Sequence, residues 1–290
     1  MGLSTFTTLF DSPLLRIGAI ACRHPRGGCG CERGGERAHL TLLRRGGFGY
    51  HIDGTVAIGD PAVALLYRSG DSYRISHPFD GGDDCTTFEL PPEHEEEVFG
   101  RRLRPRHDLR RAVSGADQFA HLALHRALLR GADDALEVEE SATRLCTSVL
   151  RGGAGADRPP RLSPSAQKRV GRVREALLGD PAGATGLPAL AALAGCSPFH
   201  LARIFRKATG LSLAGYRTSL RIALSLERLA QGEHDLSALA QDLGFSHHSH
   251  FSAAFRQQVG VTPSVARASL GAAALQRLGR KLIARHAGPD

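Results

Sequence analysis

The sequence predicts a multidomain α+β protein with a β-rich N-terminal part and an all-α C-terminal part. Three observations predict it. Short apolar runs between turn residues fill the first part of the chain, helical periodicity begins at Gly115, and one helical segment occurs twice near the C-terminus. A length of 290 residues accommodates about two domains of roughly 150 residues each.

The N-terminal part is punctuated by glycine pairs and by Asp and Pro. Apolar runs such as Ala38–Leu43, Thr55–Ile58 and Ala62–Tyr67 lie between these turn residues, which is typical of short strands joined by tight connections. We expect a small β-barrel or cupin-like sandwich. The stretch Glu93–Arg111 is polar and poorly patterned, so we interpret it as a crossover or partly helical loop.

A helical hairpin is expected at about residues 115–150. Apolar residues recur there at helical spacing on both sides of the turn at Gly131. This αα-hairpin would pack on the barrel or on a second subunit. Residues 1–150 are therefore expected to form a sensing or dimerisation domain, and the Gly- and Pro-rich residues 151–165 a linker.

The duplicated segment comprises Leu190–Leu213 and Leu239–Thr262. Aligning Gly195 with Gly244 brings Phe205 onto Phe255 and Gly210 onto Gly260, after one extra residue in the second copy. Each copy has a short apolar helix, a glycine turn, a second helix and a glycine stop. This pattern predicts two helix-turn-helix motifs, which point to duplex DNA as a partner.

Further helices complete the predicted C-terminal domain, residues 166–270. Ala166–Leu178 and Leu187–Ala194 precede the first glycine turn, and one long helix, Leu213–Ala230, would hold the two motifs in fixed relation. Residues 271–290 form a basic tail.

The positive charge of the chain lies in the half that holds the duplication. Residues 161–290 carry 17 Lys and Arg against 7 Asp and Glu, whereas residues 1–160 carry 20 against 22. A basic surface favours a polyanionic partner because neutralised phosphates release counterions. A solvated basic surface is the alternative, and the coincidence with the duplication favours DNA.

The first predicted recognition helix runs from Pro198 to Ala208. Ser197 is the expected N-cap, and Phe199, Leu201 and Phe205 would turn partly or wholly inward. The N-terminal residues of such a helix meet base edges and its flanking residues meet phosphates, although solvent-facing charges on a core helix are the alternative. The DNA-contacting candidates of this copy are Ser197, Phe199, His200, Arg203, Arg206 and Lys207.

The second recognition helix opens at Ser246 around Phe251 and Phe255. Its three histidines suggest a metal site, but only His247 and His250 have a facing spacing and no Cys, Asp or Glu accompanies them. Imidazoles can donate to phosphate or base acceptors, so we favour DNA contact. The candidates of this copy are His247, His248, Ser249, His250, Ser252 and Arg256.

These blocks resemble the paired helix-turn-helix domain of AraC/XylS-type transcriptional regulators. The resemblance covers roughly residues 165–268 and is most specific in the second copy. One departure is His250, where Tyr is commoner. The matching positions are Gly244, Phe245, Ser249, Phe251, Phe255, Gly260, Thr262 and Pro263.

The resemblance implies a seven-helix domain whose two recognition helices enter successive major-groove segments. It also implies a sequence-specific regulator of promoter activity, with RNA polymerase as a second partner. Members often place a β-barrel domain for sensing and dimerisation in front, so an unknown small effector and a homodimer are expected here. No membrane partner is expected.

Cys22, His24, Cys29 and Cys31 form a cluster of potential metal ligands. Such a set can wrap zinc or copper(I), although its spacing is not that of usual structural zinc sites. Cys85 and His77 could join only if the fold brings them close. We favour the alternative, reduced thiols in a Gly-rich loop, and therefore expect no cofactor unless this cluster binds zinc or another metal.

A second candidate is an effector site at the turn-rich segment Tyr67–Asp84. Polar side chains there could hold a small anionic ligand at the mouth of the barrel, or form a solvated rim: Arg68, Tyr73, Arg74 and His77. No catalytic motif is present, so we expect no enzyme. The alternative functions are a metal or thiol redox-sensing regulator and a cysteine-domain enzyme delivered to DNA.

The N-terminal residues lack the basic start and unbroken apolar core of a signal peptide, because Asp11 and Arg16 interrupt them. No apolar run approaches the roughly 18 residues that a membrane span needs. We therefore expect a cytoplasmic protein.

Overall fold

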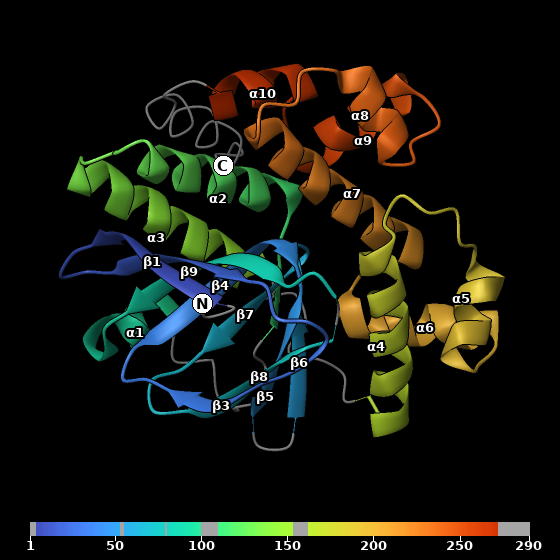
Figure 1. The fold of residues 1–290 in the computed structure, drawn as a ribbon, viewed down its shortest axis with the longest axis horizontal. Coiled ribbons are helices and arrows are strands. Elements are labelled where there is room, and N and C mark those ends of the chain that lie inside the picture. The colour runs from blue at the N-terminus through green and yellow to red at the C-terminus, as the bar shows by residue number, and fades with distance from the viewer. Residues whose placement is uncertain (1–3, 53–54, 79, 100–109, 153–161, 272–290) are drawn as a thin grey trace, which may run out of the picture.

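A computed structural model shows how these segments fold (Figure 1). It describes residues 4–52, 55–78, 80–99, 110–152 and 162–271. The predicted linker and basic tail therefore lie largely outside the described residues. Among those described, no single helix is long and apolar enough to cross a membrane. One bent pair of helices, Leu187–Ala194 and Pro198–Thr209 with an angle of 82° between them, would be long and apolar enough, judged by length and composition alone.

The N-terminal half contains two antiparallel sheets. The first has the strand order β1-β2-β9-β4-β7-β10, and the second has the order β3-β8-β5-β6. The first sheet comprises β1 (Ser4–Asp11), β2 (Arg16–Cys22), β9 (Asp83–Leu90), β4 (Ala38–Gly46), β7 (Val63–Tyr67) and β10 (Arg110–Ala112). The second comprises β3 (Gly27–Gly34), β8 (Ser72–His77), β5 (Phe48–Ile52) and β6 (Thr55–Gly59).

A small apolar core fills the space between the sheets. Leu43 and Leu65 from the first sheet meet Phe48, Tyr50 and Ile52 from the second. The expected strands at β4, β6 and β7 are confirmed. The described strands remain two separate sheets and do not close into one barrel, because no strand pairing joins β1 or β10 to the second sheet. The segment expected to be partly helical contains α1 (Pro92–Phe99).

The predicted hairpin is present as α2 (Gly115–Leu129) and α3 (Ala135–Gly152). Ser114 and Asp117 form a capping box that starts α2. Val138 and Val149 of α3 are fully buried in the core of the six-stranded sheet. The hairpin therefore packs within the chain.

Helix α2 buries two faces at once. Leu124 and Leu128 join the core of the sheet, whereas Phe119 and Leu122 join a core of the C-terminal half. Figure 1 shows α2 between α3 and the C-terminal helices. Because both faces are covered, this one helix attaches the two halves to each other.

The C-terminal half forms seven helices within its described residues. They build two apolar cores, one around each helix-turn-helix motif, and the long helix α7 contributes to both. The predicted long helix is confirmed. The helices are α4 (Pro164–Gly179), α5 (Leu187–Ala194), α6 (Pro198–Thr209), α7 (Leu213–Ala230), α8 (Leu236–Asp242), α9 (His248–Val259) and α10 (Pro263–Gly271).

A buried polar group joins the β domain to the first motif. Asp60, in the turn before β7, accepts hydrogen bonds from Arg174 of α4 and Tyr216 of α7. Arg174 also donates to the Tyr216 hydroxyl at 3.0 Å and to the Ile58 carbonyl at 3.0 Å. Burial works to lower the pKa of Arg174, but Asp60 and Tyr216 outweigh it and the pKa is raised. The guanidinium is therefore charged, and its Nε and Nη2 both donate hydrogen bonds.

We expect Arg174→Ala to lower the free energy of unfolding by about 3–5 kcal/mol, because it leaves the Asp60 carboxylate buried without its cation. Arg172, two residues earlier and exposed, supplies the matched control, and Arg172→Ala should cost no more than about 0.5 kcal/mol. Urea denaturation of both variants measures the difference. Equal losses would contradict the assigned role of Arg174.

Acid should destabilise the fold through the buried histidines of α2. Burial, assisted by Arg44 and Arg126, lowers the pKa of His125 to about 3. The folded state therefore keeps His125 neutral, while the unfolded chain protonates it below about pH 6.5. The contribution of neutral His125 to the free energy of unfolding is fully present above that pH. Below it, this contribution falls by up to about 1.4 kcal/mol per pH unit.

His125→Gln should reduce this slope by nearly that amount between pH 6 and 5 in urea denaturation. The exposed His234 provides a control, because His234→Gln should leave the slope unchanged. An unaltered slope in His125→Gln would refute the assignment.

Candidate DNA-binding interface

The two glycine turns have the same left-handed backbone. Gly195 has φ 64° and Gly244 has φ 74°, a region that disfavours other residues. At Gly244 space adds a second constraint, since a Cβ would lie 2.2 Å from the Ala182 carbonyl oxygen. The extra residue of the second copy lies in the turn, because α6 begins three residues after its glycine and α9 four.

The first recognition helix, α6, is held by an apolar stripe of Leu201, Ile204 and Phe205. The Ser197 hydroxyl accepts from the His200 backbone N–H at 3.2 Å, so Ser197 is the N-cap. The prediction that Phe199 turns inward is wrong, because its side chain is 89% exposed. At about 100° per residue, Phe199 lies roughly 200° around the helix from Leu201.

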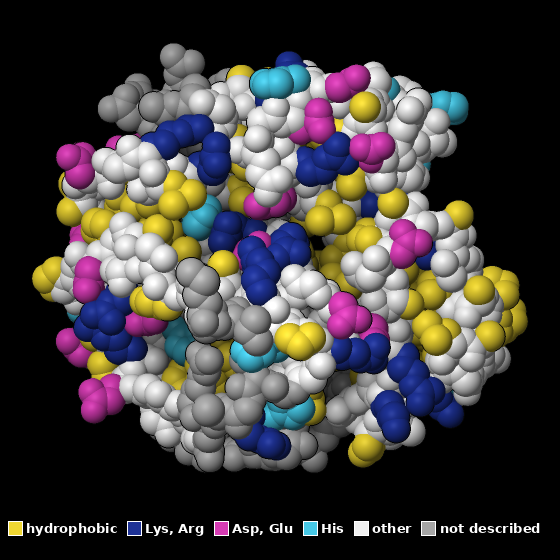
Figure 2. Space-filling view, viewed as in Figure 1, with side chains coloured by type: hydrophobic (Ala, Val, Ile, Leu, Met, Phe, Trp, Pro, Cys, Tyr) yellow, Lys and Arg dark blue, Asp and Glu magenta, His cyan; other side chains and the backbone are white. Residues whose placement is uncertain are grey.

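A basic cleft of about 350 Å³ lies between α6 and the start of α4. His200, Arg203 and Lys207 line one side, and Arg169 of α4 lines the other. Arg203 Nη2 lies 3.2 Å from His200 Nδ1, so these two candidates are neighbours on the helix surface. Figure 2 shows Lys and Arg side chains over this end of α4, beside the apolar side chains of α5 and α6.

Sequence reasoning missed Arg169. The cluster of Lys168, Arg169 and Arg172 could have indicated it, but this cluster lies on a helix outside the duplicated segment. Arg206 lies on the exposed side of α6, outside the residues that line the cleft.

The second recognition helix, α9, begins at His248 with His247 as its N-cap, one residue later than the expected opening at Ser246. Ser246 instead places its hydroxyl 3.3 Å from His250 Nδ1. The Phe245 ring contacts the edge of the His250 ring, with centroids 5.5 Å apart. The side chain of His250, where the sequence departs from the family pattern, is therefore contacted by both Ser246 and Phe245.

The remaining candidates of the second copy lie over its buried phenylalanines. His248, Ser249 and Arg256 are exposed and Ser252 is half-buried, while Phe251 and Phe255 are fully buried. Within the described residues, the only group of ligand atoms close enough to hold a metal ion lies elsewhere in the chain. The histidines of α9 thus present separate donors.

Arg221 of α7 joins the glycine turn of the second copy to the loop between α4 and α5, a role that sequence reasoning missed. It donates to the Gly244 carbonyl at 2.8 Å and to the Pro181 and Ala182 carbonyls at 2.7 and 3.1 Å. Its guanidinium also lies 5.5 Å from the centre of the Phe245 ring. Burial and nearby Arg217 lower its pKa. No motif marks this arginine, because its partners are backbone carbonyls.

The four effector-site candidates differ in their environment. On β8 the side chain of Arg74 is exposed, whereas His77, three residues later, is buried. Tyr73 packs between the sheets against Tyr50 and Tyr67, with ring centroids 4.6 Å from both. Arg68 follows β7 and is half-buried.

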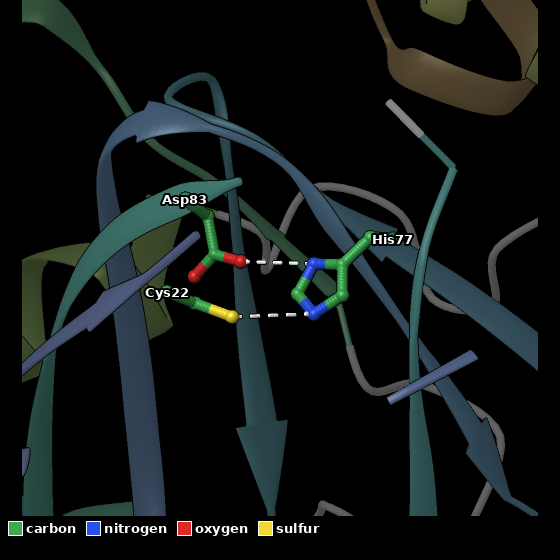
Figure 3. A group of neighbouring side chains, drawn as sticks. All are labelled: Cys22, His77 and Asp83. Atoms are coloured by element: carbon green, nitrogen blue, oxygen red, sulfur yellow. Dashed lines mark hydrogen bonds and ion pairs between the residues drawn. The ribbon is translucent and has the colours of Figure 1, made fainter. Parts of the chain in front are cut away.

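Only part of the predicted metal-ligand cluster is described at the level of side chains. Cys22 lies beside His77 and Asp83 (Figure 3). The His24 ring stacks on the His77 ring, with centroids 5.6 Å apart. Cys29 and Cys31 belong to β3, and their side chains lie outside the described residues. The structure thus groups Cys22 with two residues far along the chain.

Comparison with known proteins places the similarity in the C-terminal half. A family model described as a helix-turn-helix domain matches residues 190–269. The HTH-type transcriptional regulator RipA of Corynebacterium glutamicum is 33% identical over 108 residues, covering 37% of this chain and 32% of that protein. The HTH-type transcriptional activator RhaR of Cronobacter sakazakii is 33% identical over 84 residues, covering 27% and 30%.

The matches thus span about a third of the length of these relatives. A solved structure of ToxT from Vibrio cholerae aligns with 89% of this chain and 100% of its own, at 12% identity and a TM-score of 0.37. With their duplicated motif, two left-handed glycine turns and buried phenylalanines, residues 190–269 form a helix-turn-helix domain of the AraC type.

Proposed function

We propose that this protein is a sequence-specific DNA-binding regulator of transcription. The observation that carries the proposal is the pair of helices α6 and α9, each opened by a left-handed glycine turn. Both are anchored by buried phenylalanines and leave polar side chains exposed. Two such helices on one rigid domain can enter successive segments of the major groove.

The side chains divide into two kinds of contact. Arg169, Arg206 and Lys207 carry charge beside the first recognition helix and suit phosphates, which position the protein without reading sequence. His200 is half-buried and Arg203 is exposed, both line the cleft, and both suit base edges or nearby phosphates. In the second copy, Arg256 is the only Lys or Arg of α9, so the histidines and serines supply its remaining donors.

We further propose that the N-terminal half modulates DNA binding in response to an effector, and that RNA polymerase and a second copy of the chain are partners. The burial of α2 on two faces supports the modulation of DNA binding, because Phe119 and Leu122 pack on the core that holds α9. A change in the sheet would therefore reach the second motif through α2.

The DNA proposal is tested by selecting duplexes from a random pool with the full chain and measuring affinity for the enriched sequence at several salt concentrations. We expect Arg203→Ala and Arg256→Ala each to weaken binding, by about 1–3 kcal/mol if the side chain contacts a base. Arg144→Ala on α3, an exposed arginine paired with Glu140, removes the same charge far from the motifs and should leave affinity unchanged. Failure to enrich any sequence would sink the proposal.

Phe199→Ala should leave stability within about 0.5 kcal/mol, since the ring is exposed, but should reduce affinity for the selected sequence. An exposed aromatic at the start of a recognition helix suits contact with a thymine methyl group. Phe205→Ala is the matched control, and should cost about 3–5 kcal/mol of stability because that ring is fully buried. Unchanged affinity in Phe199→Ala would exclude a role in base recognition.

A further inference from the structure

Three potential metal ligands meet where the two sheets of the N-terminal half adjoin. Cys22 is the last residue of β2, Asp83 is the first of β9, and the two are directly paired across the first sheet. His77 is the last residue of β8 in the second sheet. All three side chains are buried, with at most 3% exposed. Six residues of sequence separate His77 from Asp83, but 55 separate Cys22 from His77.

The spacing of the ligand atoms fits a single small ion. One ligand atom from each residue lies within 4.8 Å of the other two. Asp83 Oδ1 is 3.2 Å from His77 Nδ1, whereas Cys22 Sγ is 3.4 Å from the other ring nitrogen, Nε2 (Figure 3). Because one ion binds only one nitrogen of an imidazole, Cys22 Sγ and His77 Nε2 are the two atoms to compare with zinc geometry. Tetrahedral zinc, with bonds of about 2.3 Å to sulfur and 2.0–2.1 Å to nitrogen, places those two atoms about 3.5 Å apart.

The charge of the cluster also calls for a cation. Asp83 Oδ1 is buried, and within the described part of the chain it has no hydrogen bond of good geometry, although the His77 imidazole lies 3.2 Å away. The neighbouring arginines pair with a different carboxylate, because Arg23 and Arg45 contact Asp84 at 2.7 and 2.9 Å. A buried carboxylate with no permanent cation beside it is costly, and a thiolate nearby would add a second negative charge. A divalent cation neutralises both.

The backbone holds the cluster in place. Gly82, immediately before Asp83, has φ 69°, and a Cβ there would lie 2.0 Å from the Cys22 carbonyl oxygen. Gly46 packs in the same way on Gly82, where a Cβ would lie 2.1 Å from its carbonyl oxygen. Only glycine fits at both positions, so the strands that carry Cys22 and Asp83 approach closely and keep one register.

We propose that Cys22, His77 and Asp83 form a binding site for a Zn²⁺ ion that links the two sheets. Thiolate, imidazole and carboxylate are together the ligand types of zinc, whereas Mg²⁺ and Ca²⁺ prefer oxygen alone. An activated catalytic thiol would use the same residue types, but Cys22 is only 3% exposed and offers no approach to a molecular substrate. This proposal does not depend on the DNA-binding function.

Three protein ligands leave one position of a tetrahedral ion for a further donor. The His24 ring is stacked on His77, and β3 passes beside β8 with an irregular stretch between its pairings Gly28–Ser76 and Glu32–Arg74.

The proposal is tested by stripping metal from the full-length chain with a chelator and titrating it with Co²⁺, a spectroscopic substitute for Zn²⁺, without DNA. We expect one ion per chain and a thiolate-to-cobalt charge-transfer band. Cys22→Ser should abolish that band, and Asp83→Asn should weaken binding roughly 10-fold or more. Cys196→Ser, at a half-buried thiol of the other half, is the matched control and should change neither.

Thermal unfolding provides a second readout that separates metal loss from misfolding. Zn²⁺ should raise the melting temperature of the wild type and of Cys196→Ser, but not that of Cys22→Ser, whose circular dichroism should remain native. The proposal is overturned if the charge-transfer band persists in Cys22→Ser, if it depends on Cys29 and Cys31 alone, or if wild type binds no cobalt.

Discussion

The buried Asp60 carboxylate determines where the first helix-turn-helix motif lies. It accepts hydrogen bonds from Arg174 and Tyr216, which come from the two helices that flank α5 and α6. Buried ions must be partnered in specific geometry, so this contact fixes direction as well as proximity. The second motif is attached differently, because it packs through apolar side chains on α2. The two motifs thus differ in their main attachment to the N-terminal half, which is polar for the first and apolar for the second.

The two motifs also differ on the surface that would face DNA. The first copy places Arg203 and Lys207 beside Arg169 around a cleft, whereas α9 has one arginine and a row of separate histidines. Arg221 holds the turn of the second copy against the loop between α4 and α5 through backbone carbonyls. Equivalent backbones thus carry different chemistry, as expected if the two copies contact different stretches of one DNA site.

Local patterns predicted most helices, the repeat and its glycine turns, because periodicity and left-handed glycines depend on near neighbours. Contacts between distant segments could not be predicted. Asp60 looked like an ordinary turn residue until the fold brought Arg174 to it. Cys22 was grouped with cysteines near it in sequence, whereas strand pairing brings it to Asp83. Phe199 was predicted to face inward because its side chain is apolar. Its position around the helix, roughly 200° from the buried Leu201, should have counted for more.

The double burial of α2 has a consequence for how the chain folds. A fragment that begins after the linker would expose the apolar surface that Phe119, Leu122 and Ala123 now cover on Ile222 and Leu226. A fragment that ends before it would expose those three side chains themselves. Neither half is then a self-sufficient folding unit, and the two halves should unfold in one cooperative transition despite their separate cores.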